Sequence, residues 1–180
     1  GDNAYVQNEG LIRIDPSHQC ICILLNHYTF VVIPITSKGL GAQFVIYKSQ
    51  LRMEGEVKDF QFLHNSILPS FAVLCENTPS WSGTAGYAGS NVSLLIVTIT
   101  PAVKKAEVIF HYHGLPYDCT AIQPLRTSDQ AFLVVSSHIL FTFASQVPHL
   151  LVLNKYGEQY VKERAYVLPN SVFANARSIT

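Results

Sequence analysis

Short apolar runs separated by clusters of turn-forming residues recur along almost the whole chain. Runs of about four to eight residues that are rich in Val, Ile, Phe and Thr are typical of β-strands. The sequence therefore predicts an all-β protein. Its strands are expected at residues 11–14, 20–25, 28–35, 43–48, 59–64, 71–76, 93–100, 106–112, 120–125, 131–136, 138–143 and 149–153.

The predicted strands group into three consecutive sets of four, at about 11–48, 57–113 and 119–153. Four short antiparallel strands that recur every ~40–50 residues are typical of the blades of a β-propeller. Because propellers close with roughly four to eight blades, three blades predict a partial β-propeller, a sector of a larger ring. Residues 1–10 are expected to be an N-terminal extension, and residues 154–180 an extended arm or the start of a further blade.

The middle strands of the sets are almost continuously apolar, as at residues 93–97 and 132–135. Such strands are expected to be buried on both faces, which happens when sheets stack face to face. The chain begins with Gly1 and its only methionine is Met53, so we expect a piece of a longer protein. The faces and edges left open at the ends of the sector favour self-association.

Tight turns are expected at residues 26–27 and 137–138, whereas residues 77–91 form a long insert between two paired strands. The insert carries the only tryptophan, Trp81, together with Tyr87. Two interpretations remain open. Trp81 covers the edge of its blade, or Trp81 and Tyr87 contact a partner, since an aromatic side chain on a loop is a common interface anchor.

Charge is scarce, since 13% of the residues are charged and 48% are hydrophobic, where an ordinary soluble domain has ~25% charged residues. Twelve basic and twelve acidic residues cancel, so no broad basic face for phosphates is expected. No apolar run reaches the ~18 residues of a membrane-spanning helix, so no membrane contact is predicted. The cysteines lack C-x-x-C spacing, which favours reduced thiols in an intracellular protein. They are Cys20, Cys22, Cys75 and Cys119.

Two residue pairs resemble metal ligands, because alternation along a strand puts His111 beside His113 and Cys20 beside Cys22. The pairs lie in different strand sets, and strand alternation alone generates such pairs. Small buried cysteines and hydrogen-bonded histidines are the favoured interpretation, so no metal or other cofactor is predicted.

No catalytic residue is predicted either. The chain has no G-x-S-x-G motif, and the Ser-His neighbours at 17–18 and 137–138 point their side chains apart on a strand. Asp15 and Asp118 lie at turns, where a carboxylate accepts backbone hydrogen bonds. The sequence therefore favours an interaction module over an enzyme. A hydrolase, the alternative, would require His, Ser and Asp side chains to converge in a cleft.

Six segments carry a resemblance to a known family. They are LIRIDP at 11–16, DFQFLH at 59–64 with PSFAVLCEN at 69–77, LPYDCTAIQPL at 115–125, AFLVVSSHIL at 131–140 and QVPHLLVLN at 146–154. In this order they resemble the large propeller subunit of the cleavage and polyadenylation specificity factor. The turn at 126–131 is shorter than the family's Pro- and Gly-rich turn, and Ser137-His138 replaces its usual Asn turn, which indicates a divergent member.

The resemblance implies part of the first propeller of a nuclear scaffold for pre-mRNA 3′-end processing. In that family the large subunit holds a zinc-finger subunit and a WD-repeat subunit, which read the polyadenylation signal, so RNA contact by the scaffold is mainly indirect. Two alternatives stay open. One is a module that binds single-stranded RNA directly, through exposed aromatic residues and the basic residues between Lys155 and Arg177. The other is a propeller of the related DNA-damage or splicing complexes.

Overall fold

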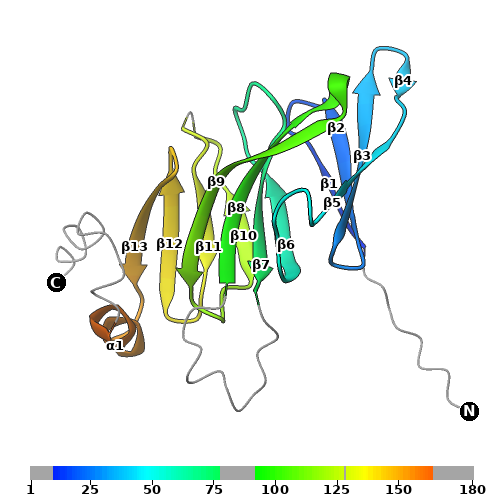
Figure 1. Ribbon diagram of the computed structural model, residues 1–180. Coiled ribbons are helices and arrows are strands. Elements are labelled where there is room, and N and C mark those ends of the chain that lie inside the picture. The colour runs from blue at the N-terminus through cyan, green and yellow to red at the C-terminus, as the bar shows by residue number, and fades with distance from the viewer. Residues whose placement is uncertain (1–9, 78–91, 128, 164–180) are drawn as a thin grey trace, which may run out of the picture.

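Three antiparallel β-sheets stand one after another along the molecule (Figure 1). The structure is a computed structural model that describes residues 10–77, 92–127 and 129–163. The first sheet contains β1 (Leu11–Ile14), β2 (Cys20–Leu25), β3 (Thr29–Thr36), β4 (Gly39–Leu40) and β5 (Phe44–Tyr47). The second contains β6 (Glu56–Phe62), β7 (Ser70–Glu76), β8 (Val92–Thr100) and β9 (Lys105–Leu115). The third contains β10 (Ala121–Pro124), β11 (Phe132–Val135), β12 (Ile139–Ala144) and β13 (Val147–Val152).

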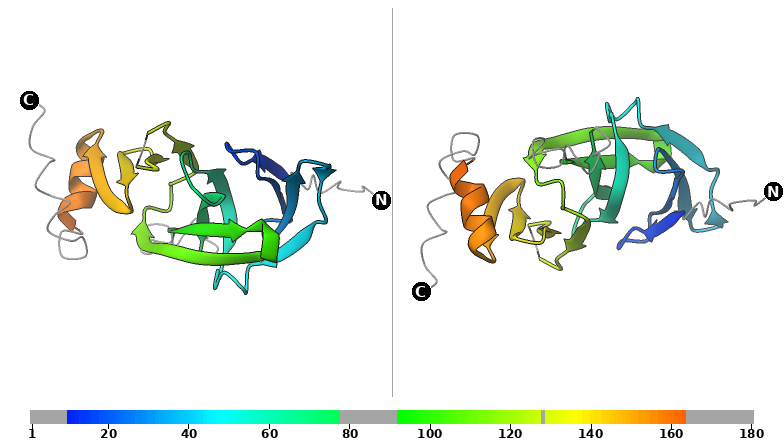
Figure 2. Two further views of the ribbon diagram at one scale, coloured as in Figure 1. Left: turned by 90° about the horizontal axis from the view of Figure 1, so that it is seen from above. Right: turned by 90° about the horizontal axis from the view of Figure 1, so that it is seen from below.

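Each sheet is a meander in which strands that follow one another in the chain pair with one another. The predicted all-β, partial-propeller fold of three stacked sets is confirmed, and the described strands close no barrel (Figure 2). One detail differs from the prediction. The first sheet has an additional two-residue strand, β4, which pairs only with the end of β3, while β5 takes the fourth position beside the middle of β3.

Tight turns set the register of the hairpins. Asn26 and His27, between β2 and β3, have φ values of 51° and 59°, and Ser145 and Gln146, between β12 and β13, have 48° and 65°. Two central residues in the left-handed region match the twist of the flanking strands, which explains why two-residue turns suffice. The turn at 137–138 is closed by a 3.1 Å hydrogen bond from the Ser136 amide to the Ile139 carbonyl. Both predicted tight turns are confirmed.

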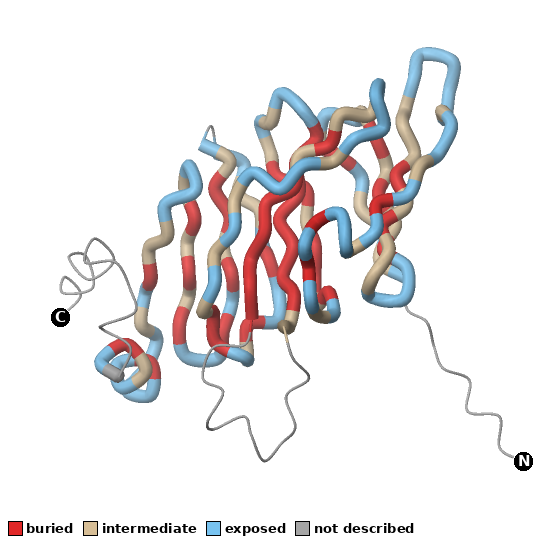
Figure 3. Tube along the Cα trace, in the orientation of Figure 1, coloured by how far each residue is buried: buried red, intermediate tan, exposed pale blue. Residues whose placement is uncertain are grey.

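The second sheet is buried on both faces (Figure 3). Along β7, Phe71 and Val73 face the first sheet and belong to one hydrophobic cluster, whereas Ala72 and Leu74 face the third sheet and belong to another. The adjacent strand β8 divides in the same way, because Leu94 faces the third sheet and the next residue, Leu95, faces the first sheet. This two-sided burial explains the continuous apolar runs, and confirms the prediction for residues 93–97.

The prediction of two-sided burial is wrong for residues 132–135. Phe132 and Val134 are buried against the second sheet, but Leu133 is half-buried and Val135 is 39% exposed. The physical reason is that the third sheet has a neighbour on one face only. Its outer face is largely apolar, although no other sheet among the described residues covers this face.

Residues 155–163 also differ from the prediction, because they form a helix, α1 (Lys155–Glu163), and not a strand or an extended arm. Asn154 caps its first turn by accepting hydrogen bonds of 3.1 Å from the amides of Tyr156 and Gly157. A side chain at Gly157 would meet the His138 carbonyl oxygen at 2.4 Å, so glycine lets α1 approach the β11–β12 turn. Val161 then packs into the second cluster. Residues 1–9 and 164–180, predicted as extension and arm, lie outside the described ranges.

Besides α1, the described ranges contain a 3₁₀ turn, η1 (Pro101–Val103), at the tip of the β8–β9 hairpin. Neither α1 nor any other helix in these ranges is long and apolar enough to cross a membrane.

The stacking predicts unequal costs for two aromatic truncations. Phe71 is fully buried, and its ring lies 5.3–5.7 Å from the rings of Phe30, Phe60 and Phe62. We expect Phe71→Ala to lower the free energy of unfolding by about 3–5 kcal/mol, because it leaves a cavity between two sheets. Tyr47, 56% exposed on the first sheet, serves as the control, and Tyr47→Ala should cost less than about 1 kcal/mol. Urea denaturation measures both, and equal losses would contradict the stacked arrangement.

Candidate functional site

One carboxylate joins all three sheets. Asp59 lies on β6, the first strand of the second sheet, and is buried. Its Oδ2 atom accepts a 2.9 Å hydrogen bond from the backbone amide of Ile122 on β10, in the third sheet. Its Oδ1 atom lies 3.5 Å from the Arg13 guanidinium on β1, in the first sheet. The first strands of the three sheets are therefore held in a fixed relation by one side chain.

Asp59 also accepts a 3.4 Å hydrogen bond from the Gln61 side-chain amide on its own strand, and its two contacts with other sheets differ in strength. The Ile122 amide is buried, so removing its acceptor would leave an unsatisfied donor inside the protein, at a cost of roughly 1–3 kcal/mol. The Arg13 contact is longer, and the Arg13 side chain is partly exposed, which places it closer to a surface ion pair of roughly 0–1 kcal/mol. Arg13 also lies over the Phe60 ring, 5.7 Å from its centroid. The Asp59–Ile122 bond is thus the dominant polar link at this junction.

Further polar links join the sheets at the end where α1 lies. The Val57 amide on β6 donates to the His27 carbonyl at 3.1 Å, and the Tyr28 hydroxyl donates to Glu56 at 2.6 Å. This hydrogen bond is the main reason that the pKa of Tyr28 is raised. Between the second and third sheets, the Lys58 ammonium donates to the Tyr117 carbonyl at 2.7 Å.

The outer face of the first sheet is a continuous apolar surface. Side chains in register across β1, β2, β3 and β5 form rows on this face. One row consists of Ile12, Ile23, Val31 and Val45, and another of Ile14, Ile21 and Ile33. None is classed as buried, and Ile12 and Ile14 are more than half exposed. We call this set of seven residues the first outer face.

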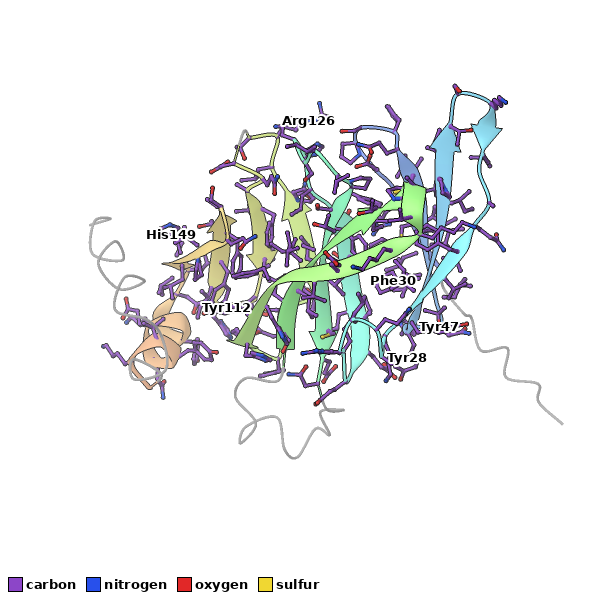
Figure 4. All side chains as sticks on the ribbon, turned by 45° about the horizontal axis from the view of Figure 1, so that its top comes forward. Tyr28, Phe30, Tyr47, Tyr112, Arg126 and His149 are labelled. Atoms are coloured by element: carbon purple, nitrogen blue, oxygen red, sulfur yellow. The ribbon has the colours of Figure 1, made fainter. Side chains whose placement is uncertain are left out.

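The outer face of the third sheet is also largely apolar, with more polar positions. Ala121, Val135, Leu140 and Leu151 form one row across β10 to β13. The next row consists of Gln123, Leu133, Thr142 and His149. Figure 4 shows His149 at the β13 end of this sheet, far from Tyr28 and Tyr47 on the first sheet. We call these two rows the second outer face. Side chains of this kind on flat sheets are suited to packing against another sheet.

The residues predicted to contact a partner, Trp81 and Tyr87, lie outside the described ranges, so their roles stay predictions. The described residues that flank the insert are joined by hydrogen bonds. The Asn77 side-chain amide donates to the Ser93 hydroxyl at 2.9 Å, and this hydroxyl lies 3.2 Å from Nδ1 of His113. β7 and β8 are thereby fixed to β9 next to the insert.

The two pairs that resemble metal ligands stay apart. The rings of His111 and His113 are 3.7 Å apart on β9, whereas Cys20 and Cys22 are buried between the first two sheets. Burial, with a smaller contribution from Asp15, raises the pKa of Cys20 to about 12, and burial also raises the pKa of Cys22. In residues 10–77, 92–127 and 129–163, no three His, Cys, Asp or Glu side chains gather as a metal site would require.

Both turn aspartates behave as the sequence predicts. Asp15 accepts a 3.0 Å hydrogen bond from the Gln19 amide. Asp118 accepts 2.9 Å hydrogen bonds from the Ser136 hydroxyl and the Ser137 amide. These carboxylates hold the β1–β2 and β11–β12 turns, which is a structural role.

Sequence reasoning missed the importance of Arg13 and Asp59. Arg13 lies in a strand whose other residues are apolar, and Asp59 takes a buried position on β6, where polar and apolar residues are mixed. A charge directed into a core requires a partner, so this pattern signals an ion pair or a buried hydrogen bond. The signal does not identify the partner, because Ile122 contributes only its backbone amide.

The junction predicts a graded response to substitution of Asp59. Asp59→Ala removes the acceptor of the Ile122 amide and should lower the free energy of unfolding by about 1–3 kcal/mol in urea denaturation. Asp59→Asn keeps an oxygen acceptor and should cost less. Glu107 provides the control, because its pair with Lys105 is exposed, and Glu107→Ala should change stability by less than about 0.5 kcal/mol. Similar effects of Asp59→Ala and Glu107→Ala would refute the junction.

His111 makes stability depend on pH. Burial and, to a smaller extent, His113 lower its pKa from 6.5, so the unfolded chain binds this proton at a higher pH than the folded chain. The free energy of unfolding should therefore fall as the pH drops below 6.5 toward the lowered pKa. Urea denaturation at a series of pH values should show a smaller slope for His111→Gln than for the unchanged chain. An identical slope would show that His111 contributes nothing.

Comparison with known proteins gives the relationships of the chain. No family model matches it. It is 22% identical to cleavage and polyadenylation specificity factor subunit 1 of Arabidopsis thaliana over 183 residues, which cover 91% of this chain and 12% of the plant protein. It is 31% identical to protein CFT1 of Candida albicans over 84 residues, 47% of this chain and 6% of that protein. Protein CFT1 of Debaryomyces hansenii is 22% identical over 57% of this chain and 8% of its own length.

The chain therefore spans about an eighth or less of the length of these relatives. The match to the plant protein extends over nearly the whole sequence, in agreement with the six segments that carry the resemblance. The predicted resemblance is confirmed: the chain is similar, at low identity, to subunit 1 of the cleavage and polyadenylation specificity factor.

Proposed function

We propose that this chain is a non-catalytic scaffold module of the pre-mRNA 3′-end cleavage and polyadenylation machinery and acts in the nucleus. The similarity to cleavage and polyadenylation specificity factor subunit 1 over 91% of the chain is the observation that carries the proposal. The chain corresponds to a sector of the first propeller of such a subunit. Its partners are the zinc-finger and WD-repeat subunits of the complex, which bind the polyadenylation signal, so the chain meets RNA mainly through them.

The two outer faces support a scaffold role. The first presents two rows of aliphatic side chains in register and the second presents one, which suits them to packing against further sheets of a ring. Two of the buried or half-buried carboxylates have structural roles, because Asp59 joins the sheets and Asp118 holds a turn. The zero net charge also supports indirect contact with RNA, because tight binding of a phosphate backbone relies on an excess of Lys and Arg.

RNA binding by the isolated chain tests this proposal. In a gel-shift titration with an RNA that contains the polyadenylation hexamer, we expect weak binding that falls steeply as salt is raised. An RNA of the same length with a scrambled hexamer should bind equally, because phosphate contacts carry no sequence information. Tight binding that depends on the hexamer would contradict the scaffold role and favour direct recognition of RNA. Retention of the zinc-finger and WD-repeat subunits on the immobilised chain is the complementary expected result.

A further inference from the structure

A pocket opens between the second and third sheets, at the end of the molecule opposite α1. Its volume is about 320 Å³. The floor is apolar and buried, formed by Leu63, Ile96 and Phe132. The rim comes from the β10–β11 and β12–β13 turns. The three side chains of the floor belong to the hydrophobic cluster between the second and third sheets.

The rim is built from turns that are hydrogen-bonded to one another and to the second sheet. The Ser145 amide donates to the Asp129 carbonyl at 3.1 Å, which ties the β12–β13 turn to the β10–β11 turn. The Asn65 side-chain amide donates to the Thr127 carbonyl at 2.6 Å, which ties the β10–β11 turn to the β6–β7 turn. The backbone at Thr127, Asp129 and Ser145 is therefore held in place, which lowers the entropic cost of ordering these turns on binding.

The rim contains residues in the left-handed region of the backbone, as several other turns of the described ranges do. Three non-glycine residues of the rim, Gln130, Ser145 and Gln146, have φ values of 56°, 48° and 65°. The β12–β13 hairpin accounts for Ser145 and Gln146, since a two-residue turn requires both. Gln130 belongs to a longer turn that has no such requirement. Residues held in this region cost about 1–3 kcal/mol each and gather at ligand sites.

The chemistry of the lining defines what fits. Asp129 is the one charged residue that lines the pocket, and its exposed carboxylate has no hydrogen-bond or ion-pair partner in the described part of the chain. Gln130 and Gln146 also line the pocket, and each has a side-chain amide oxygen that can accept a hydrogen bond. An apolar floor below a carboxylate and two amides complements a ligand with an aliphatic stem and a cationic end that donates hydrogen bonds.

Phosphate ligands do not match this lining. No lysine or arginine lines the pocket, and the Asp129 carboxylate would repel an anion. Arg126 lies on the same turn but is exposed and is not a lining residue (Figure 4). A nucleic-acid backbone is therefore disfavoured at this position.

We propose that this pocket binds an arginine side chain presented by a protein partner. The aliphatic stem packs on Leu63, Ile96 and Phe132, and the guanidinium donates hydrogen bonds to the Asp129 carboxylate and to the Gln130 and Gln146 amide oxygens. Arginine fits better than lysine, because the guanidinium is planar, has five donors and is more weakly hydrated than an ammonium group. The volume lies at the lower end of the ~300–1,000 Å³ range of small-ligand sites, which suits a single side chain.

The inference rests on the proposed scaffold role only in taking the partner to be a protein. The test therefore uses small probes. The ¹⁵N-labelled chain is titrated with N-acetyl-arginine methylamide while the amide resonances of Gln130, Ser145 and Gln146 are followed by NMR. The matched control probe is N-acetyl-citrulline methylamide, which has nearly the same shape without the charge. Asp129→Asn removes the charge without touching the backbone carbonyl that accepts from Ser145, and Glu107→Gln on β9 serves as the control variant.

We expect saturable shifts of these resonances with the arginine probe. Citrulline, and arginine with Asp129→Asn, should bind at least about tenfold more weakly, because the charge-assisted hydrogen bond is lost. Glu107→Gln should leave binding unchanged. Absence of shifts, equal shifts with citrulline, or binding that survives Asp129→Asn would overturn the proposal. Any of these results is compatible with retention of the other subunits by the chain, so failure of the pocket and failure of the scaffold role are distinguishable.

Discussion

The second sheet is stable only between two neighbours, and this constraint organises the molecule. Consecutive residues of β7 and β8 are apolar, so alternation along each strand sends large side chains to both faces. A solvent-exposed face of this composition would forfeit roughly 25 cal/mol for every Å² of apolar area left in water. The first and third sheets supply the two covers, and the aromatic contacts of Phe71 on one face and Phe143 on the other show how closely they pack.

Apolar burial does not by itself fix how sheets sit on one another, because hydrophobic contact has no direction. Asp59 provides that direction, since its hydrogen bond to the Ile122 amide specifies one relation of β6 to β10. Arg13 extends the link to β1. The composition of the two outer faces likewise predicts what packs on them. The first and second outer faces repeat the aliphatic rows of the covered faces, so each is suited to a further sheet of the same kind.

Most of the strands could be predicted because alternation and turn chemistry are local. β1 and β2 begin and end where the apolar pattern places them, and the left-handed turn at Asn26 and His27 follows from residue preferences at tight hairpins. The helix α1 could not be predicted, because its position depends on the close approach of Gly157 to the His138 carbonyl, a contact between segments that are separate in the sequence. The Asp59–Ile122 hydrogen bond and the pocket beside Asp129 could not be predicted for the same reason, since each is formed by residues of two different sheets. β11 is buried on one face only because no described sheet packs on its other face. The sequence of a strand does not show which of its faces is covered.

If the outer faces receive further sheets, the isolated chain should associate with itself in solution through them. Sedimentation velocity of the chain over a range of concentrations should show reversible self-association, because exposed sheet faces find each other when no other sheet covers them. Ile23→Lys, in the middle of the first outer face, should shift the distribution toward monomer. Ile67→Lys, on the exposed β6–β7 loop, should leave it unchanged. A monodisperse monomer at every concentration, or equal effects of the two substitutions, would contradict this role of the outer faces.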